Sequence, residues 1–317
     1  MTTYKDESKA QKYLGIADLW HNSDVIRIEC PVSGGLAEKC TWIPREGSVR
    51  DNPSTGVIEC QRCQLVTHAD DLSKSVNYES GTMHDWASGY GDNLPGPAAD
   101  SNRRVEAIKE LEKTHKFRSI LDFGCGSGGM LEVLSKDYLT IGIEPDGGAR
   151  ETAIQKGLDV YESADALIEK GITVDVITLF HVAEHFYDPS IELARIFKIL
   201  RPEGLLIIET PNANDALITK YMNPSFENFT YWSHHPMLHS YESLEALVVR
   251  NQFTILENRG VQRYDLNNHL YWLAKGLPGG HEVWKKNLSD ATIECYAEDL
   301  IKSRTCDTLW LVAQKNL

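Results

Sequence analysis

Short apolar runs alternate with amphipathic stretches over residues 101–317. The run at 174–180 is nearly continuous Val, Ile and Leu, as expected for a strand buried on both faces. The stretches between the runs have the spacing of helices that cover a sheet. The pattern predicts strands at 119–123, 140–144, 158–161, 174–180, 204–210, 253–258 and 308–313, and helices at 102–115, 148–156, 189–200 and 243–251. This alternation indicates an α/β fold with a doubly wound, mostly parallel seven-stranded sheet.

The first 100 residues follow another pattern. Residues 1–24 are polar apart from one amphipathic patch, which predicts a short helix or an arm. Strand-like pieces at 25–28 and 57–59 alternate with Gly, Pro and Ser turns, and 71–100 is polar, as a linker would be. We therefore expect a small β-rich module with its linker, and a larger domain with insertions between its strands. The expected boundaries are 1–100 for the module, 101–317 for the domain, and 211–240 and 261–304 for the insertions.

Composition narrows the classes of partner. The chain has 317 residues, 42% of them hydrophobic, and a formal net charge of −14. A nucleic-acid partner calls for a basic surface, so the negative charge argues against one and favours a small metabolite. No apolar run is long enough to span a membrane, and the first residues lack the apolar core of a secretion signal. We expect a cytoplasmic protein without a membrane partner; the oligomeric state is left open.

A glycine-rich turn joins the first predicted strand of the domain to a helix. Gly124, Gly126 and Gly129 satisfy the G-x-G-x-x-G pattern, and Glu144 follows Gly124 by twenty residues, as in dinucleotide-binding folds. Asp122 stands two places before the first glycine. A carboxylate there opposes a pyrophosphate but suits an ammonium group, and S-adenosylmethionine carries an amino group and no phosphate.

The string 121–128, Leu-Asp-Phe-Gly-Cys-Gly-Ser-Gly, together with Gly-Ile-Glu-Pro-Asp at 142–146, resembles class I S-adenosylmethionine-dependent methyltransferases. The resemblance implies that Glu144 holds both ribose hydroxyls and that Asp165 accepts from the adenine amino group. The alternative for Asp165 is a helix N-cap, at Ser163 or at Asp165 itself. The cofactor-binding residues that the resemblance implies are Asp122, Phe123, Gly124, Gly126, Gly128, Glu144, Pro145, Asp165, Phe180 and His181.

The loop after the strand at 174–180 carries the candidate catalytic residues His185, His181 and Glu184. It lies at the carboxyl edge of the sheet, and histidine titrates near working pH, so His185 or His181 could take the proton from an acceptor hydroxyl. The loop also resembles that of ubiquinone-type O-methyltransferases, which implies a divalent metal, Mg or Mn, at His181, Glu184, His185 and Asn212. A third alternative is that these residues only fix the loop by hydrogen bonds.

Seven cysteines are unevenly spread over the chain. Cys60 and Cys63 form a C-x2-C pair after a predicted strand, which resembles one knuckle of a zinc ribbon. Cys30 begins a second knuckle that has Ser33 in place of its second cysteine, and Cys40 could supply the missing thiolate. Many sugar-modifying methyltransferases resemble this layout, which implies one structural zinc at the four sites. The alternative is a module with free cysteines.

The two insertions hold the candidate acceptor-binding residues Tyr231, His234, His235, His239 and Arg263. Aromatic faces with imidazoles suit a polar ring, and Arg263 could neutralise a phosphate. We expect transfer of a methyl group to a hydroxyl of a nucleotide-linked sugar, in carbohydrate biosynthesis. Alternatives are C-methylation of a deoxysugar and O-methylation of a quinone or polyketide. Two other classes stay open, a nicotinamide-dependent oxidoreductase, which Asp122 argues against, and a non-catalytic binding module.

Overall fold

The computed structural model describes residues 26–28, 30–32, 40–70, 97–285 and 287–316. The predicted arm at 1–24 and most of the predicted linker, 71–96, lie outside the described residues. In the described part of the chain, no helix is both long and apolar enough to cross a membrane.

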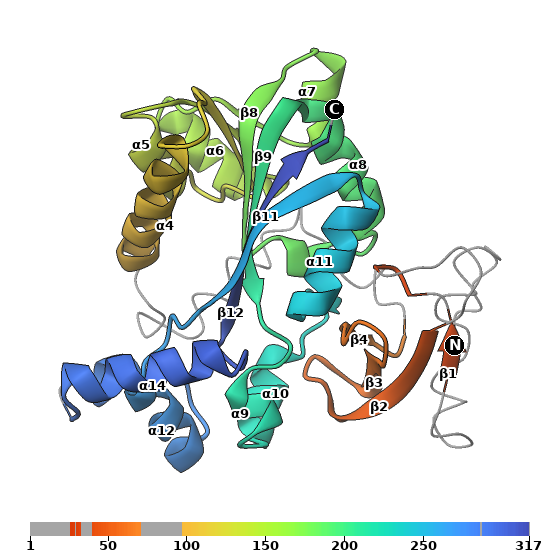
Figure 1. The fold of residues 1–317 in the computed structure, drawn as a ribbon, viewed down its shortest axis with the longest axis vertical. Coiled ribbons are helices and arrows are strands. Elements are labelled where there is room, and N and C mark those ends of the chain that lie inside the picture. Colours follow the sequence, from red (N-terminus) through yellow and green to blue (C-terminus); the bar gives the residue numbers. More distant parts are fainter. Residues whose placement is uncertain (1–25, 29, 33–39, 71–96, 286, 317) are drawn as a thin grey trace.

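A seven-stranded sheet forms the centre of the larger domain (Figure 1). Its strands stand in the order β11-β12-β9-β8-β5-β6-β7. All neighbouring pairs are parallel except those of β12, which runs antiparallel to both β9 and β11. The predicted mostly parallel sheet is thus confirmed. The strands are β5 (Ser119–Phe123), β6 (Leu139–Ile143), β7 (Val160–Tyr161), β8 (Val174–Phe180), β9 (Leu200–Pro211), β11 (Phe253–Val261) and β12 (Thr308–Lys315).

Successive residues of the central strands feed two separate layers of core. Ile120 packs in one layer and Leu121 in the other, and Val176 and Ile177 divide in the same way. Because neighbouring side chains of a strand point to opposite faces, a continuous apolar run is what a sheet covered on both sides requires. In Figure 1, α4, α5 and α6 cover one face of the sheet, and α8 and α11 cover the other.

The helices begin where the sequence supplies caps. The Asp188 carboxylate accepts the backbone N–H of Ile191, and Pro189 occupies the first turn of α8. Ser240 and Ser243 form a reciprocal capping box that starts α11. The helices are α4 (Pro97–Glu112), α5 (Gly129–Leu134), α6 (Gly147–Gln155), α7 (Ala164–Glu169), α8 (Pro189–Ile199), α9 (Ala216–Thr219), α10 (Pro224–Thr230), α11 (Tyr241–Arg250), α12 (Leu266–Lys275), α13 (Gly280–Val283) and α14 (Asp290–Lys302), with a 3₁₀ turn, η3 (Ala183–His185).

A second, antiparallel sheet contains the N-terminal strands, in the order β1-β2-β3-β4-β10. Its last strand, β10 (Met237–Leu238), comes from the stretch predicted as an insertion of the larger domain. The Thr67 hydroxyl also donates to the carbonyl of Pro236 at 2.7 Å. The N-terminal strands are β1 (Ile26–Ile28), β2 (Cys40–Val49), β3 (Asn52–Cys60) and β4 (Val66–His68).

The two predicted insertions are more regular than their sequences indicate. The first, 211–240, holds α9, α10 and β10, and the second, 261–304, holds α12, α13 and α14. Their glycines and prolines lie between these elements or at their ends, so the breaks in the apolar pattern mark turns and not a long irregular loop.

Candidate functional site

Two adjoining cavities open at the carboxyl edge of the parallel strands. The first, about 760 Å³, lies over the glycine turn after β5, and the second, about 400 Å³, lies between the ends of β9 and β12 and helices α10 and α12. His181 and His185 line both cavities. These two side chains therefore lie where the two cavities adjoin. Ligands of open α/β sheets bind at this edge.

The glycine turn has a backbone that other residues adopt only with strain. Gly124, Gly126 and Gly128 have φ of 74°, 54° and 85°. A Cβ on Gly128 would lie 2.2 Å from a methyl of Leu158, so this glycine lets α5 begin against the neighbouring segment. Gly124 and Gly126 line the first cavity, whereas Gly128 lies behind it.

Glu144 lies at the end of β6 on the wall of the first cavity. Its carboxylate accepts the backbone N–H of Gly126 at 2.7 Å and that of Asp146 at 2.8 Å. Burial raises the pKa of Glu144, and the two N–H donors oppose the rise. The carboxylate thus ties the glycine turn to the strand beside it and still faces the cavity. Phe123 and Pro145 line the same cavity.

Asp122 lies beneath the turn and does not line either cavity. Its carboxylate is buried and accepts the hydroxyl of Thr178 from β8 at 2.7 Å. Burial raises the pKa of Asp122 to about 6. Phe180 also lies outside both cavities, because its ring stacks on Trp310, 6.0 Å between centroids. Of the cofactor-binding residues expected from the sequence, Asp122, Phe180 and Gly128 do not line the first cavity.

Asp165 lines the first cavity beside Ser163, at the start of α7. Ser163 is the N-cap, since its hydroxyl accepts the backbone N–H of Ala166. The Asp165 carboxylate makes an ion pair with Arg195 of α8, 2.8 Å between oxygen and nitrogen. Asp165 is therefore not the cap, and its carboxylate is shared with an arginine that lines the same cavity.

His181 is held by both ring nitrogens at the junction of the cavities. Its φ of 58° is left-handed, an unusual backbone for a residue with a Cβ. Nδ1 lies 3.2 Å from the Glu184 carboxylate, and Nε2 lies 2.7 Å from a guanidinium nitrogen of Arg263. Arginine can only donate, so Nε2 accepts and Nδ1–H donates to Glu184. Burial alone would raise the pKa of Glu184, but the hydrogen bond from His181 lowers it, to about 2.

His185 occupies the end of the 3₁₀ turn η3. Its Nδ1 lies 2.6 Å from the backbone carbonyl of His234. Because a carbonyl only accepts, the proton of the neutral ring lies on Nδ1 and the lone pair on Nε2. The His235 ring lies 4.9 Å away between centroids. Burial lowers the pKa of His235 to about 3, so its ring is neutral near pH 7.

Glu184, His185 and His235 place ligand atoms within 4.8 Å of one another. This differs from the predicted metal set, which had His181 and Asn212 in place of His235. Both ring nitrogens of His181 are taken up by Glu184 and Arg263, and the Asn212 side chain donates to the carbonyls of Arg304 and Cys306. The sequence could not bring His235 to this set, because it is fifty residues further along the chain.

Aromatic side chains wall the second cavity. Phe226 and Phe229 of α10 pack on Trp272 of α12, with ring centroids 5.2 and 5.3 Å apart, and Trp232 lies beside them. Arg263 lines this cavity, but Asp100 of α4 takes its guanidinium with two hydrogen bonds. Within the described residues, Arg263 is the single Arg or Lys of the lining, which also includes three carboxylates, Glu184, Asp215 and Asp307.

Three of the predicted acceptor residues lie away from both cavities. Tyr231 is buried against the N-terminal sheet, near Gly47. His234 stacks on Trp232, 4.2 Å between centroids, and His239 is fully buried with Nδ1 near the Ser243 hydroxyl. His235 and Arg263 do line the second cavity.

A buried carboxylate on β9 went unrecognised in the sequence. Glu209 is fully buried and accepts from Arg103 at 2.7 Å and Arg104 at 2.6 Å, both on α4. Its carboxylate also lies 3.3 Å from Nε2 of His181. The available signal was the glutamate itself, since it interrupts the apolar run of the strand at 204–210.

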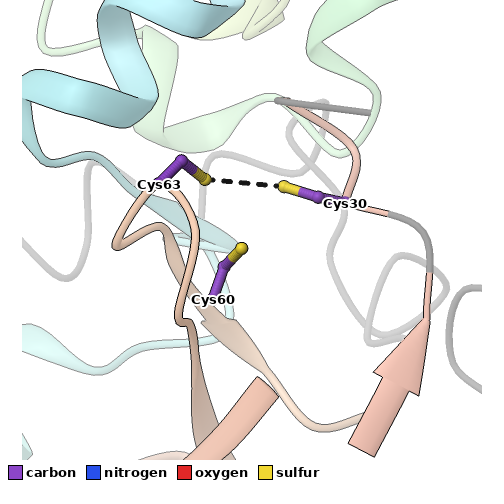
Figure 2. Close-up of side chains that lie close together, drawn as sticks. All are labelled: Cys30, Cys60 and Cys63. Atoms are coloured by element: carbon purple, nitrogen blue, oxygen red, sulfur yellow. Dashed lines mark hydrogen bonds between the residues drawn. The ribbon is translucent and has the colours of Figure 1, made fainter. Parts of the chain in front are cut away.

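Three of the four predicted zinc ligands come together. The sulfurs of Cys30, Cys60 and Cys63 lie within 4.8 Å of one another, with 3.6 Å between Cys30 and Cys63 (Figure 2). The Cys40 side chain is buried but does not belong to this group. Hydrogen bonds with Cys30 and Cys63 raise the pKa of Cys60, and the hydrogen bond with Cys30 raises that of Cys63 to about 12. Such a group ionises readily only beside a cation.

Comparison with known proteins points to one family. The family model described as "Methyltransferase domain" matches residues 99–258, which is half of the chain. A "Ubiquinone biosynthesis O-methyltransferase" of Ruegeria pomeroyi is 36% identical over 107 residues, 30% of this chain and 42% of the relative. A protein of the same name from Aeromonas salmonicida is 33% identical over 106 residues, 31% of this chain and 44% of the relative. The matches span less than half the length of these curated relatives.

Among solved structures, a "SAM dependent methyltransferase" from Archaeoglobus fulgidus is similar at 18% identity and a TM-score of 0.48. The match covers 74% of this chain and 99% of that one.

Proposed function

This chain belongs to the class I S-adenosylmethionine-dependent methyltransferases, and from that premise we propose that it transfers a methyl group to a hydroxyl on an aromatic ring. The observation that carries the proposal is the pair of cavities that share His181 and His185. The first cavity would hold the cofactor and the second the acceptor.

The first cavity fits S-adenosylmethionine by its chemistry. It has the Glu144 carboxylate as an acceptor for ribose hydroxyls and the turn at Gly124 and Gly126, where backbone without Cβ atoms can approach a ligand. Asp165 and Arg195 stand at the end where the sequence resemblance puts the adenine. When bound, the cofactor supplies an electrophilic methyl group.

His185 is the group that we assign as general base. Its Nδ1–H is fixed on the carbonyl of His234, so Nε2 carries the lone pair that can accept a proton from the acceptor oxygen. His181 is a positioning residue, because its Nε2 already accepts from Arg263. These two hydrogen bonds are our reason to propose His185 and not His181 as the base.

The walls of the second cavity favour a planar acceptor. Phe226, Phe229 and Trp272 offer apolar faces on which an aromatic ring can stack. The nucleotide-linked sugar expected from the sequence finds less support, because a diphosphate needs cations. The arginine of the lining is paired with Asp100, and the Glu184 carboxylate, whose pKa is lowered, would repel a diphosphate. The relatives above are named for ubiquinone biosynthesis, which supports the quinone acceptor given as an alternative in the sequence analysis.

A divalent metal is the second candidate for this site. Glu184, His185 and His235 supply one carboxylate and two imidazoles within reach of a single ion, a set that suits Mn better than Mg, because Mg prefers oxygen ligands. Such an ion would polarise the acceptor hydroxyl and make its deprotonation easier.

Methyl incorporation tests the proposal. The protein with labelled S-adenosylmethionine is offered 3,4-dihydroxybenzoate, a phenol and a uridine-diphosphate sugar, and products are weighed by mass spectrometry. We expect methylation of the aromatic hydroxyl, and His185→Ala should lower kcat by about 10²–10⁴ with S-adenosylhomocysteine affinity retained. His115→Ala, in the turn after α4, is the control. Methylation of the sugar alone would refute the acceptor assignment.

A chelator separates base from metal. If an ion is required, EDTA abolishes turnover, added Mg or Mn restores it, and His235→Ala is as damaging as His185→Ala. If His185 acts alone, turnover survives EDTA and His235→Ala keeps most of it.

We also propose that Cys30, Cys60 and Cys63 hold a structural zinc, with the fourth ligand still to be assigned. Three thiolates suit zinc better than magnesium or calcium. A bound ion would fasten the segment at Cys30 to the turn that follows β3.

A further inference from the structure

The turn between β2 and β3 holds a segment of the larger domain, residues 229–235, which we call the bridging segment. The Arg50 backbone N–H donates to the carbonyl of Tyr231 at 3.0 Å, and its side chain donates to that of Phe229 at 3.1 Å. The Asp51 carboxylate accepts both the backbone N–H of Ser233, at 3.0 Å, and its hydroxyl, at 2.5 Å. Four hydrogen bonds thus connect two residues of the N-terminal sheet to three of this segment.

The other side of the bridging segment faces the base. The Tyr187 hydroxyl donates to the carbonyl of Ser233 at 2.6 Å. The next carbonyl along the chain, that of His234, accepts from Nδ1 of His185 at 2.6 Å. The Ser233–His234 backbone therefore lies between Asp51 on one side and the candidate base on the other.

We propose that Asp51 is a positioning residue of the active site, which fixes the Ser233–His234 backbone so that the His234 carbonyl holds His185 in one tautomer and orientation. The N-terminal sheet is then part of the catalytic apparatus and not an appended module. The inference rests on the proposed function only in taking His185 as the reacting group.

An aspartate suits this task better than other residues. Two carboxylate oxygens can take the amide and the hydroxyl of Ser233 at once, and both bonds are charge-assisted. Partial burial raises the pKa of Asp51, but these two bonds outweigh it and hold the pKa below its usual range. The carboxylate therefore stays ionised at neutral pH, and the hold on the segment persists there.

Nuclear magnetic resonance of ¹⁵N-histidine-labelled full-length protein tests this without an acceptor. The Nδ1–H of His185 is identified by its loss in His185→Gln. We expect Asp51→Ala to remove or shift that signal and Asp51→Asn, which keeps one acceptor oxygen, to retain it. Asp70→Ala is the matched control, because Asp70 accepts from Thr55 within the same sheet. An unchanged signal in Asp51→Ala overturns the inference.

Kinetics supply an independent readout. With 3,4-dihydroxybenzoate, Asp51→Ala should lower kcat at least about tenfold while S-adenosylhomocysteine affinity stays within twofold, since misplacing a reacting group affects turnover and not cofactor binding. In a His185→Ala background the same change should add nothing, because both act through one group. Additive losses would overturn the inference. If no aromatic hydroxyl is methylated, the proposed function fails. The resonance experiment still decides whether Asp51 positions His185, because it needs no acceptor.

A second variant covers the case in which Asp51→Ala does not fold. Ser233→Ala removes the hydroxyl donor and keeps the backbone N–H, so it should weaken the hold in part and give a smaller loss of the same signal. Full retention of the signal in Ser233→Ala, together with loss of fold in Asp51→Ala, would reduce Asp51 to a structural role.

Discussion

Replacement of Glu144 by glutamine removes a charge from the wall of the first cavity with little change of shape. The wild-type carboxylate accepts from Gly126 and Asp146, whose N–H groups lie 2.7 and 2.8 Å from its two oxygens. A glutamine has one oxygen and one NH₂ group, so one of these N–H groups, or a ribose hydroxyl, meets a donor instead of an acceptor.

The magnitude follows from the loss of one charge-assisted acceptor. Such a bond contributes about 1.5–3 kcal/mol, so the dissociation constant of S-adenosylhomocysteine should rise roughly 10- to 150-fold. Glu144→Ala should weaken binding at least tenfold as well. Because burial raises the pKa of Glu144, wild-type affinity should also begin to fall on acidification at a higher pH than an ordinary glutamate would give. The glutamine variant should lack that fall.

Isothermal titration calorimetry between pH 8 and pH 5 measures both effects. Thermal unfolding of the same samples shows whether the fold persists. Glu151→Gln is the control, since Glu151 lies exposed on the neighbouring α6, where its carboxylate accepts from Gln155. An affinity of Glu144→Gln within twofold of wild type, with the fold intact, would refute the assignment of Glu144 to the ribose.

Three further predictions concern stability and metal. The pKa of Asp122 is about 6 in the folded protein, against a reference value of 3.8. The folded state therefore favours the protonated carboxyl, and the free energy of unfolding falls as pH rises from about 4 to 6. Asp122→Asn should therefore gain about 2 kcal/mol relative to wild type between pH 4.5 and pH 7 in urea unfolding, and equal differences at both pH values would contradict this. Gly128→Ala should be less stable than Gly157→Ala by about 1–3 kcal/mol in the same assay. Both glycines have φ above 80°, but only the methyl group added at Gly128 would collide with a leucine, Leu158. Cys60→Ser should lose the roughly one zinc per chain that metal analysis should find in the wild type, while the exposed Cys295→Ser keeps it; wild type purified without metal would refute the zinc site.

The strands of the larger sheet and the glycine turn beneath the first cavity followed from local patterns. Apolar runs such as that of β8 specify strands buried on both faces, and glycines at 124, 126 and 128 specify a turn that needs positive φ. These signals are local, because the backbone conformation of a few residues or the burial of one run decides them. The family resemblance could be recognised for the same reason, since it depends on two short motifs, 121–128 and 142–146.

What the tertiary structure alone decided are the contacts between distant segments. His235 joins Glu184, and β10 joins the N-terminal sheet, because two chain segments fold onto one another. The sequence suggested that Arg263 could bind a phosphate, but in the folded chain its guanidinium donates to Asp100. A side chain's chemistry is given by its type, but its partners are set by packing across the whole molecule. The sequence therefore determined the fold and the glycine turn, whereas the partners of the candidate base and the lining of the second cavity depended on which groups the folded chain brought together.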